Sequence, residues 1–150
     1  MGLYSVAHQT AAGTDLPIIN LTGSAAIRVK LYDLVLGSDA APADVAGEFV
    51  VDRTTGVGTG GTALTENPLD PLTVAATAAA VGGTFTTAPV DTANSNLLMI
   101  PLNQRATFRW VAAPGSELIS TASASNGLML NCTGMSSGTP NMNACIFWSE

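Results

Sequence analysis

Short apolar runs, separated by clusters of Gly, Pro, Asn, Ser and Thr, divide this chain along its whole length. Such runs favour short strands, because the residues between them are those that form turns. We expect strands at 3–7, 16–21, 25–36, 47–53, 96–102, 106–111, 117–121, 128–132 and 142–148. Many short strands with turns between them predict an all-β fold, either a sandwich or a barrel.

The segment 27–31 alternates apolar and basic residues, which places the apolar side chains on one face of a strand and the basic ones on the other. After Asp33 the apolar positions move to Leu34 and Leu36. One extra residue explains this change of phase, so we predict a β-bulge at this point.

A similar alternation at 106–110 predicts that Phe108 and Trp110 are buried while Thr107 and Arg109 face outward.

Between residues 54 and 89 the strand pattern is lost in a segment rich in Gly, Thr and Ala, which we interpret as a long loop insert. Within it, 73–81 is rich in alanine and follows Pro71, a residue favoured at the first position of a helix. Two structures stay open for 73–81, one or two helical turns or an extended segment along the sheet. The glycines at 56–61 match the spacing of a dinucleotide-binding turn, but Pro68 follows before a helix can form, so we interpret them as loop.

The length of 150 residues fits one domain, 1–150. Only 11% of the residues are charged, and the 47% that are hydrophobic include many alanines and valines, which favours a folded core over disorder. No run reaches the roughly 18 apolar residues of a membrane span, and the N-terminus lacks the pattern of a signal peptide. We therefore expect no membrane partner and synthesis in a host cytoplasm. Residues 1–17 are a candidate N-terminal arm.

The charge balance and the side-chain chemistry exclude several classes of function. Five Lys and Arg residues against eleven Asp and Glu give a net charge of −6, which cannot form a strong phosphate-neutralising face, so we expect no direct nucleic-acid partner. His8 is the only histidine, and the chain has neither a Gly-x-Ser-x-Gly motif nor closely spaced zinc ligands. We therefore predict that the protein is not an enzyme and has no catalytic, cofactor-binding or metal site. A calcium site made from loop carboxylates is left open.

The two cysteines, Cys132 and Cys145, fall on opposite faces of their predicted strands. Cys132 shares the inward face with Leu130, whereas Ile146 and Trp148 point inward and leave Cys145 outward. A disulfide needs both sulfurs on one face, so we predict two thiols, with Cys132 buried.

Four of the five basic residues, Arg28, Lys30, Arg105 and Arg109, lie on predicted strands or strand edges. They are candidates for a subunit or capsid interface, because complementary charge sets register between partners. The alternative is ordinary solubilising charge on outward faces.

Four stretches in order along the chain, 28–38, 51–56, 103–112 and 147–150, together resemble small virion proteins of tailed bacteriophages. That group includes the jelly-roll head decoration (cement) proteins. The resemblance implies a single jelly-roll-like antiparallel β-sandwich domain of about eight to nine strands. It also implies a homotrimer on the outside of an icosahedral head that clamps neighbouring subunits of the major capsid protein.

The sequence therefore favours a virion structural protein, a capsid decoration or cement protein that acts without cofactors at the capsid surface. One alternative keeps the protein in the virion as a tail or adaptor component. An alternative of another class is a carbohydrate-binding β-sandwich, in which Tyr4, Tyr32, Trp110 or Trp148 would stack on sugar rings.

Overall fold

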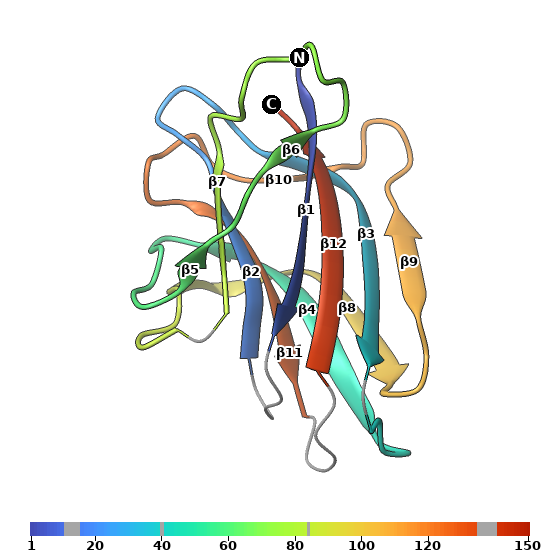
Figure 1. Cartoon of the computed structure of the whole chain (residues 1–150). Helices are drawn as coiled ribbons and strands as arrows, with labels where there is room; N and C mark the ends of the chain where they lie inside the picture. Colours follow the sequence, from blue (N-terminus) through green and yellow to red (C-terminus); the bar gives the residue numbers. More distant parts are fainter. Residues whose placement is uncertain (11–15, 40, 84, 135–140) are drawn as a thin grey trace.

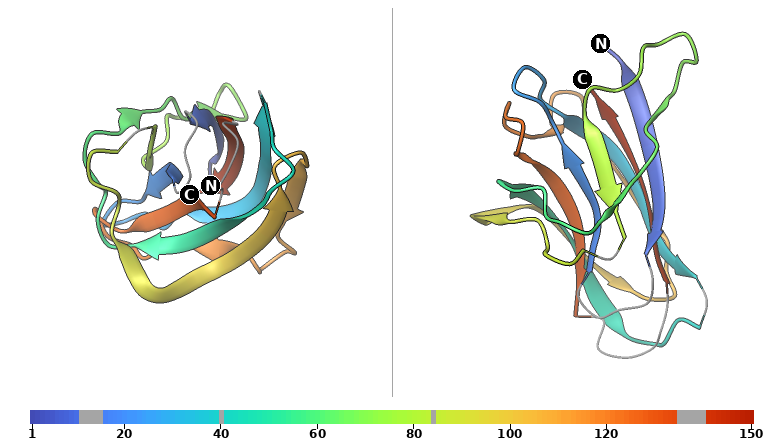
Figure 2. Two further views of the ribbon diagram at one scale, coloured as in Figure 1. Left: turned by 90° about the horizontal axis from the view of Figure 1, so that it is seen from below. Right: turned by 60° about the vertical axis from the view of Figure 1, so that its left-hand side comes forward.

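The computed structural model describes residues 1–10, 16–39, 41–83, 85–134 and 141–150. These residues form two antiparallel β-sheets that face one another as the layers of a sandwich (Figure 1, Figure 2). The described part of the chain contains no helix, which confirms the all-β prediction. Consequently none of these residues belongs to a helix long and apolar enough to cross a membrane.

Each sheet contains six strands. Sheet A has the spatial order β10 (Leu118–Ile119), β3 (Lys30–Asp39), β12 (Asn141–Ser149), β1 (Leu3–Thr10) and β6 (Asn67–Pro68), with β9 (Phe108–Val111) also paired to β3. Sheet B has the order β5 (Thr62–Ala63), β7 (Ala79–Gly82), β2 (Leu16–Thr22), β11 (Gly127–Thr133), β4 (Ala46–Thr54) and β8 (Asp91–Asn103).

The principal strands alternate between the two sheets along the chain. Their order is β9, β3, β12, β1 in sheet A and β2, β11, β4, β8 in sheet B, so most consecutive strands lie in different layers. Two interleaved Greek keys produce an alternation of this kind. This strand order favours the jelly-roll form of the sandwich. The sandwich is observed, and the jelly roll stays a prediction.

Each of the nine predicted runs contains a strand, but the run 25–36 begins to pair only at Lys30. The residues before it form a tight turn, in which Ser24 N donates to Ile27 O at 3.2 Å and Ile27 N donates to Ser24 Oγ at 3.1 Å. Because this turn carries the chain from sheet B to sheet A, the alternation at 27–31 marks a strand only at its end. Arg28 is therefore an exposed loop residue.

The core lies between the sheets and is centred on the two terminal strands. Tyr4 of β1 and Trp148 of β12 are 2% and 0% exposed, and their rings stack with centroids 5.7 Å apart. Side chains at alternate positions of β12, from Met142 to Trp148, point into this core, as the sequence predicts.

The predicted β-bulge is present in β3. Phe147 pairs with Asp33 and Trp148 with Leu31, so Tyr32 is an extra residue without a partner on β12. This insertion lets Leu31 and Leu34 both reach the core while Asp33 turns to the outer face of sheet A.

The prediction for 106–110 holds only in part. Trp110 is half-buried against the core and Arg109 is exposed, but Phe108 is 39% exposed rather than buried. The reason is that β9 is a short strand that pairs only with β3, so fewer neighbours cover its inward side chains than cover those of β12, which lies between two strands.

The insert that follows β4 is extended rather than helical. β6 adds to the edge of β1, β7 adds to the edge of β2, and β5 pairs with β7, so the insert widens both sheets on one side of the sandwich (Figure 1). Of the two structures left open for 73–81, the extended one is observed. Gly82 permits this packing, because a Cβ there would lie 2.7 Å from His8 Cδ2.

The N-terminal residues 3–10 are an integral strand. β1 pairs along its whole length with β12, so this part of the range 1–17 is built into sheet A and is not a separate arm. Residues 11–15 of that range lie outside the described residues.

Asp52 generates a prediction about stability. The residue is 6% exposed, and among the described residues its Oδ1 atom has no hydrogen-bond partner. Burial, and to a lesser extent the nearby charge of Asp91, raises the pKa of this carboxyl. The folded state therefore binds a proton at Asp52 more tightly than the unfolded state does. At neutral pH the charged carboxylate lowers the free energy of unfolding, and this penalty disappears as the pH falls toward about 4 and the group is protonated. We expect Asp52→Asn to raise Tm at pH 7 by about 2–4 °C.

The Tm difference between Asp52→Asn and wild type, measured by calorimetry, should shrink as the pH is lowered. Asp91→Asn should also raise Tm at pH 7, but by less than Asp52→Asn does. A lower Tm for Asp52→Asn at pH 7 would contradict this account.

Candidate functional site

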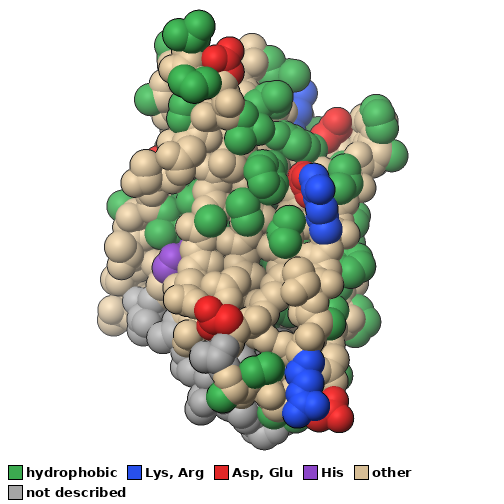
Figure 3. All heavy atoms as spheres, turned by 45° about the vertical axis from the view of Figure 1, so that its right-hand side comes forward, with side chains coloured by type: hydrophobic (Ala, Val, Ile, Leu, Met, Phe, Trp, Pro, Cys, Tyr) green, Lys and Arg blue, Asp and Glu red, His purple; other side chains and the backbone are tan. Residues whose placement is uncertain are grey.

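The four predicted interface cations do not form one patch. Arg28 lies in the loop before β3, Lys30 is the first residue of β3, and Arg109 is on β9 beside the other half of β3. Arg105 lies in the turn between β8 and β9. Figure 3 shows the basic side chains of this side of the molecule as separate groups, two of them next to acidic ones. The sequence predicted that these residues lie on strands or strand edges, but it could not show how far apart the fold holds them.

Arg109 is committed to a salt bridge. Its Nε and Nη2 atoms donate to Asp33 Oδ1 and Oδ2 at 3.0 and 2.5 Å, a bidentate pair. The hydrogen bonds and charge of Asp33 raise the pKa of the guanidinium. The Asp33 side chain is only 7% exposed, whereas that of Arg109 is 63% exposed. The pair therefore neutralises a nearly buried carboxylate and leaves a positive group at the surface.

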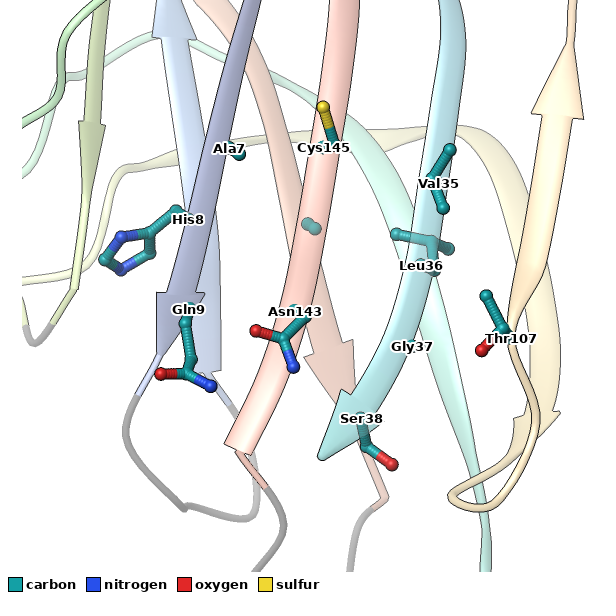
Figure 4. A pocket seen from close by; sticks show the side chains of 11 residues that line it. Ala7, His8, Gln9, Val35, Leu36, Gly37, Ser38, Thr107, Asn143 and Cys145 are labelled. Carbon is teal, nitrogen blue, oxygen red and sulfur yellow. The ribbon is translucent and has the colours of Figure 1, made fainter. Parts of the chain in front are cut away.

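A shallow hollow of about 490 Å³ lies on the outer face of sheet A. Figure 4 shows the side chains that line it, from β1, β12, β3 and the loop before β9. A row across the sheet explains the hollow, because Ala7 pairs with Cys145 and Cys145 pairs with Val35, all of them small or medium side chains. In the next row Gly37 has no side chain, and Thr107 packs over it, 3.2 Å from the position of a Cβ.

Beyond one end of the hollow, Phe147 is the next outward-facing residue of β12 after Cys145, and its ring lies beside that of Tyr32 with centroids 6.5 Å apart. At the other end Asp39 accepts hydrogen bonds from Gln9 Nε2 at 2.6 Å and from Asn141 Nδ2 at 3.1 Å. The hollow thus combines small side chains with polar ones, among them Thr107 and Asn143, and it is hydrogen-bonded at its lower end.

Cys145 faces this hollow. Its thiol is half-buried. Burial, and to a lesser extent the charge of Asp33, raises the pKa of the thiol, so the sulfur is protonated at neutral pH. Cys132 is 1% exposed in the core, and no disulfide joins the two residues, as predicted from their opposite faces.

Residues 69–74 of the insert form a second feature, which we call the apolar tip. Leu69, Leu72 and Val74 are 47%, 93% and 79% exposed. The tip lies at the end of the sandwich where the chain termini meet (Figure 1). These residues fall in the predicted loop insert, but the sequence did not predict exposed apolar side chains, because leucine and valine in a loop give no signal of which way they face.

Hydrogen bonds fix the apolar tip in place. Leu69 N donates to Leu3 O at 2.8 Å, and Tyr4 Oη donates to Val74 O at 3.1 Å. Within the tip, Leu72 N donates to Asp70 Oδ1 at 2.9 Å. Just beyond the tip, the Glu150 carboxylate accepts hydrogen bonds from Thr77 N at 2.5 Å and from Ala78 N at 2.9 Å. An ordered loop therefore presents the apolar side chains to solvent, a property of interaction sites.

Among the residues that the structure describes, no group of three or more His, Cys, Asp or Glu side chains could hold a metal ion. Comparisons with protein-family models, with curated proteins and with solved structures found no match. The function is therefore argued from the residues and the geometry.

The salt bridge gives a prediction that separates structural from interfacial charge. Arg109→Met leaves the Asp33 carboxylate unpaired and nearly buried, so we expect Tm to fall by about 4 °C or more. Arg105→Met removes an exposed cation and should leave Tm unchanged. In a double-mutant cycle measured by thermal melting, adding Asp33→Asn to Arg109→Met should recover part of the lost Tm. An unchanged Tm for Arg109→Met alone would show that the salt bridge does not stabilise the fold.

The Tyr4 hydroxyl gives a prediction about the apolar tip. Tyr4→Phe keeps the ring that stacks on Trp148 but loses the hydrogen bond to Val74 O. We expect a small fall in Tm and several-fold faster amide exchange in residues 72–78, measured by hydrogen–deuterium exchange. Tyr32→Phe is the matched control, and equal exchange in the two variants would mean that the hydroxyl does not hold the tip.

Proposed function

We propose that this chain is a virion structural protein, a decoration or cement protein that binds the outer surface of a tailed-phage head as a homotrimer. The observation that carries the proposal is the strand order, with β9, β3, β12, β1 facing β2, β11, β4, β8. Jelly rolls with this kind of alternation recur in viral capsid and lectin domains. The resemblance of four stretches of the sequence to phage virion proteins favours the capsid use over the lectin use.

The surface supports a role in assembly. A fixed apolar tip and a hollowed sheet face are two separate places where another protein can bury apolar area. The proposed mechanism is mechanical: each copy contributes a few weak contacts to neighbouring major capsid protein subunits, and lattice symmetry repeats them over the head. The internal pressure of packaged DNA is then opposed by many small binding energies.

The buried aromatic residues weigh against the carbohydrate-binding alternative. Trp148 and Tyr4 form the centre of the core and offer no ring face to a sugar. Trp110 and Tyr32 are half-buried and come from separate strands. The tail or adaptor alternative shares the same fold and differs in copy number and position in the particle.

Particles made with and without this protein test the proposal. We expect full particles to contain it in numbers comparable to the capsomers, and particles lacking it to release DNA at a lower temperature. Purified protein added back to such particles should restore the release temperature. A few copies per particle, with no change in the release temperature, would instead favour the tail or adaptor role.

Contact by the cations is tested with Arg105→Glu and Arg28→Glu, because neither change disturbs the Arg109–Asp33 pair. We expect each to reduce binding to capsids several-fold in a sedimentation assay if the capsid surface there is acidic. Arg105→Gln should have a smaller effect than the charge reversal. Undiminished binding of both charge-reversed variants would remove these residues from the interface.

A further inference from the structure

Two features of the described surface, the apolar tip and the hollow of sheet A, are suited to contact with another molecule. Leu72 and Val74 project from a loop whose backbone is already held by Leu3, Tyr4 and Glu150. Because the loop is ordered before binding, its docking would cost little conformational entropy. A tip of this kind suits insertion into a complementary recess.

The hollow has the character of such a recess. The side chains of Ala7, Val35 and Cys145 form one row of its floor, and in the next row Gly37 adds no side chain beside Asn143. The polar groups at its lower border, Gln9 and Asp39, already hydrogen-bond to one another. Apolar side chains that cover the row of Ala7, Cys145 and Val35 therefore leave Gln9 and Asp39 hydrogen-bonded, provided that the Asn143 amide in the next row stays open to solvent.

The tip cannot reach the hollow of its own chain. The tip is attached beside Leu3, at the start of β1, whereas the hollow begins at Ala7 and extends to Gln9. At the rise of a strand, about 3.3 Å per residue, Ala7 lies roughly 13 Å along β1 from Leu3. The tip is held at the end of the sandwich, and the hollow lies lower on the outer face of the sheet (Figure 1, Figure 4). A tip that fills the hollow must therefore come from another copy.

The charges near the two features are complementary. The chain has no Lys or Arg from residue 54 to residue 104, and the tip carries the exposed Asp70. The hollow is flanked by Arg109, which lies opposite Val35 on β9; it pairs with Asp33 through Nε and Nη2, but its side chain stays 63% exposed. Asp39 lies at the lower end of the hollow and would repel Asp70. The tip would therefore enter with Asp70 toward Arg109 and away from Asp39.

We infer that the apolar tip of one copy docks into the hollow on sheet A of a second copy, with Leu72 and Val74 on the small-residue floor. Such a contact joins two different surfaces, so it closes into a ring when the rotation between neighbours allows it. The inference rests on the proposed function in one respect, because it supplies the contact for the homotrimer proposed there.

Disulfide trapping tests the contact directly, because the hollow already contains Cys145. Under mild oxidation at alkaline pH, Leu72→Cys should form a disulfide with Cys145 of another copy. Peptide mapping by mass spectrometry distinguishes this link from a disulfide between two tips. The link should be absent in Leu72→Cys/Cys145→Ser and in Val57→Cys, a cysteine placed at an exposed position elsewhere in the insert.

Complementary variants give a second test. Leu72→Glu/Val74→Glu disables the tip but keeps the hollow, and Ala7→Trp fills the hollow but keeps the tip. Each alone should be monomeric by light scattering, whereas an equal mixture should form a dimer that cannot extend. The inference would be overturned if either variant alone assembled as the wild type does. It would also be overturned if the mixture stayed monomeric and no disulfide to Cys145 formed in the trapping experiment.

These outcomes are separable from failure of the proposed function. If the contact is absent but the protein still binds heads and raises their release temperature, the inferred interface is wrong and the proposed function stands. If the contact forms but the protein does not bind heads, the interface stands and the proposed function is wrong.

Discussion

The pairing of β1 with β12 is the interaction on which the other features depend. It joins the two ends of the sequence along the whole of β1 and brings Tyr4 onto Trp148 in the core. The same pairing places Ala7 beside Cys145 on the outer face, which creates the floor of the hollow. At its upper end it positions the groups that hold the apolar tip, the Leu3 carbonyl, the Tyr4 hydroxyl and the Glu150 carboxylate.

The bulge at Tyr32 divides β3 into two parts with different roles. Before it, Leu31 faces the core, and after it Leu34 resumes that position. The cost of the bulge is a nearly buried carboxylate at Asp33, which Arg109 on the neighbouring strand offsets with two hydrogen bonds. A cation that looked available for binding a partner is thus tied to a local irregularity of the backbone.

The strands and the bulge could be predicted because their signals are local, in apolar alternation and turn residues. The arrangement of the site could not, because it depends on contacts distant in sequence. Arg109 and Asp33 are 76 residues apart, and only the pairing of β9 with β3 brings them together. Phe108 alternates like a core residue, yet its strand lies at a sheet edge. The exposure of Leu72 depends on tethers from both ends of the chain, which no pattern within the insert reveals.

We propose that this β-sandwich works as an assembling structural module, and the solution mass of the purified protein tests this proposal most directly. Light scattering after size-exclusion chromatography should give three times the 15.2 kDa of one chain. The trimer should not dissociate when the salt concentration is raised. A protein that stays at 15.2 kDa at every concentration measured would contradict the account.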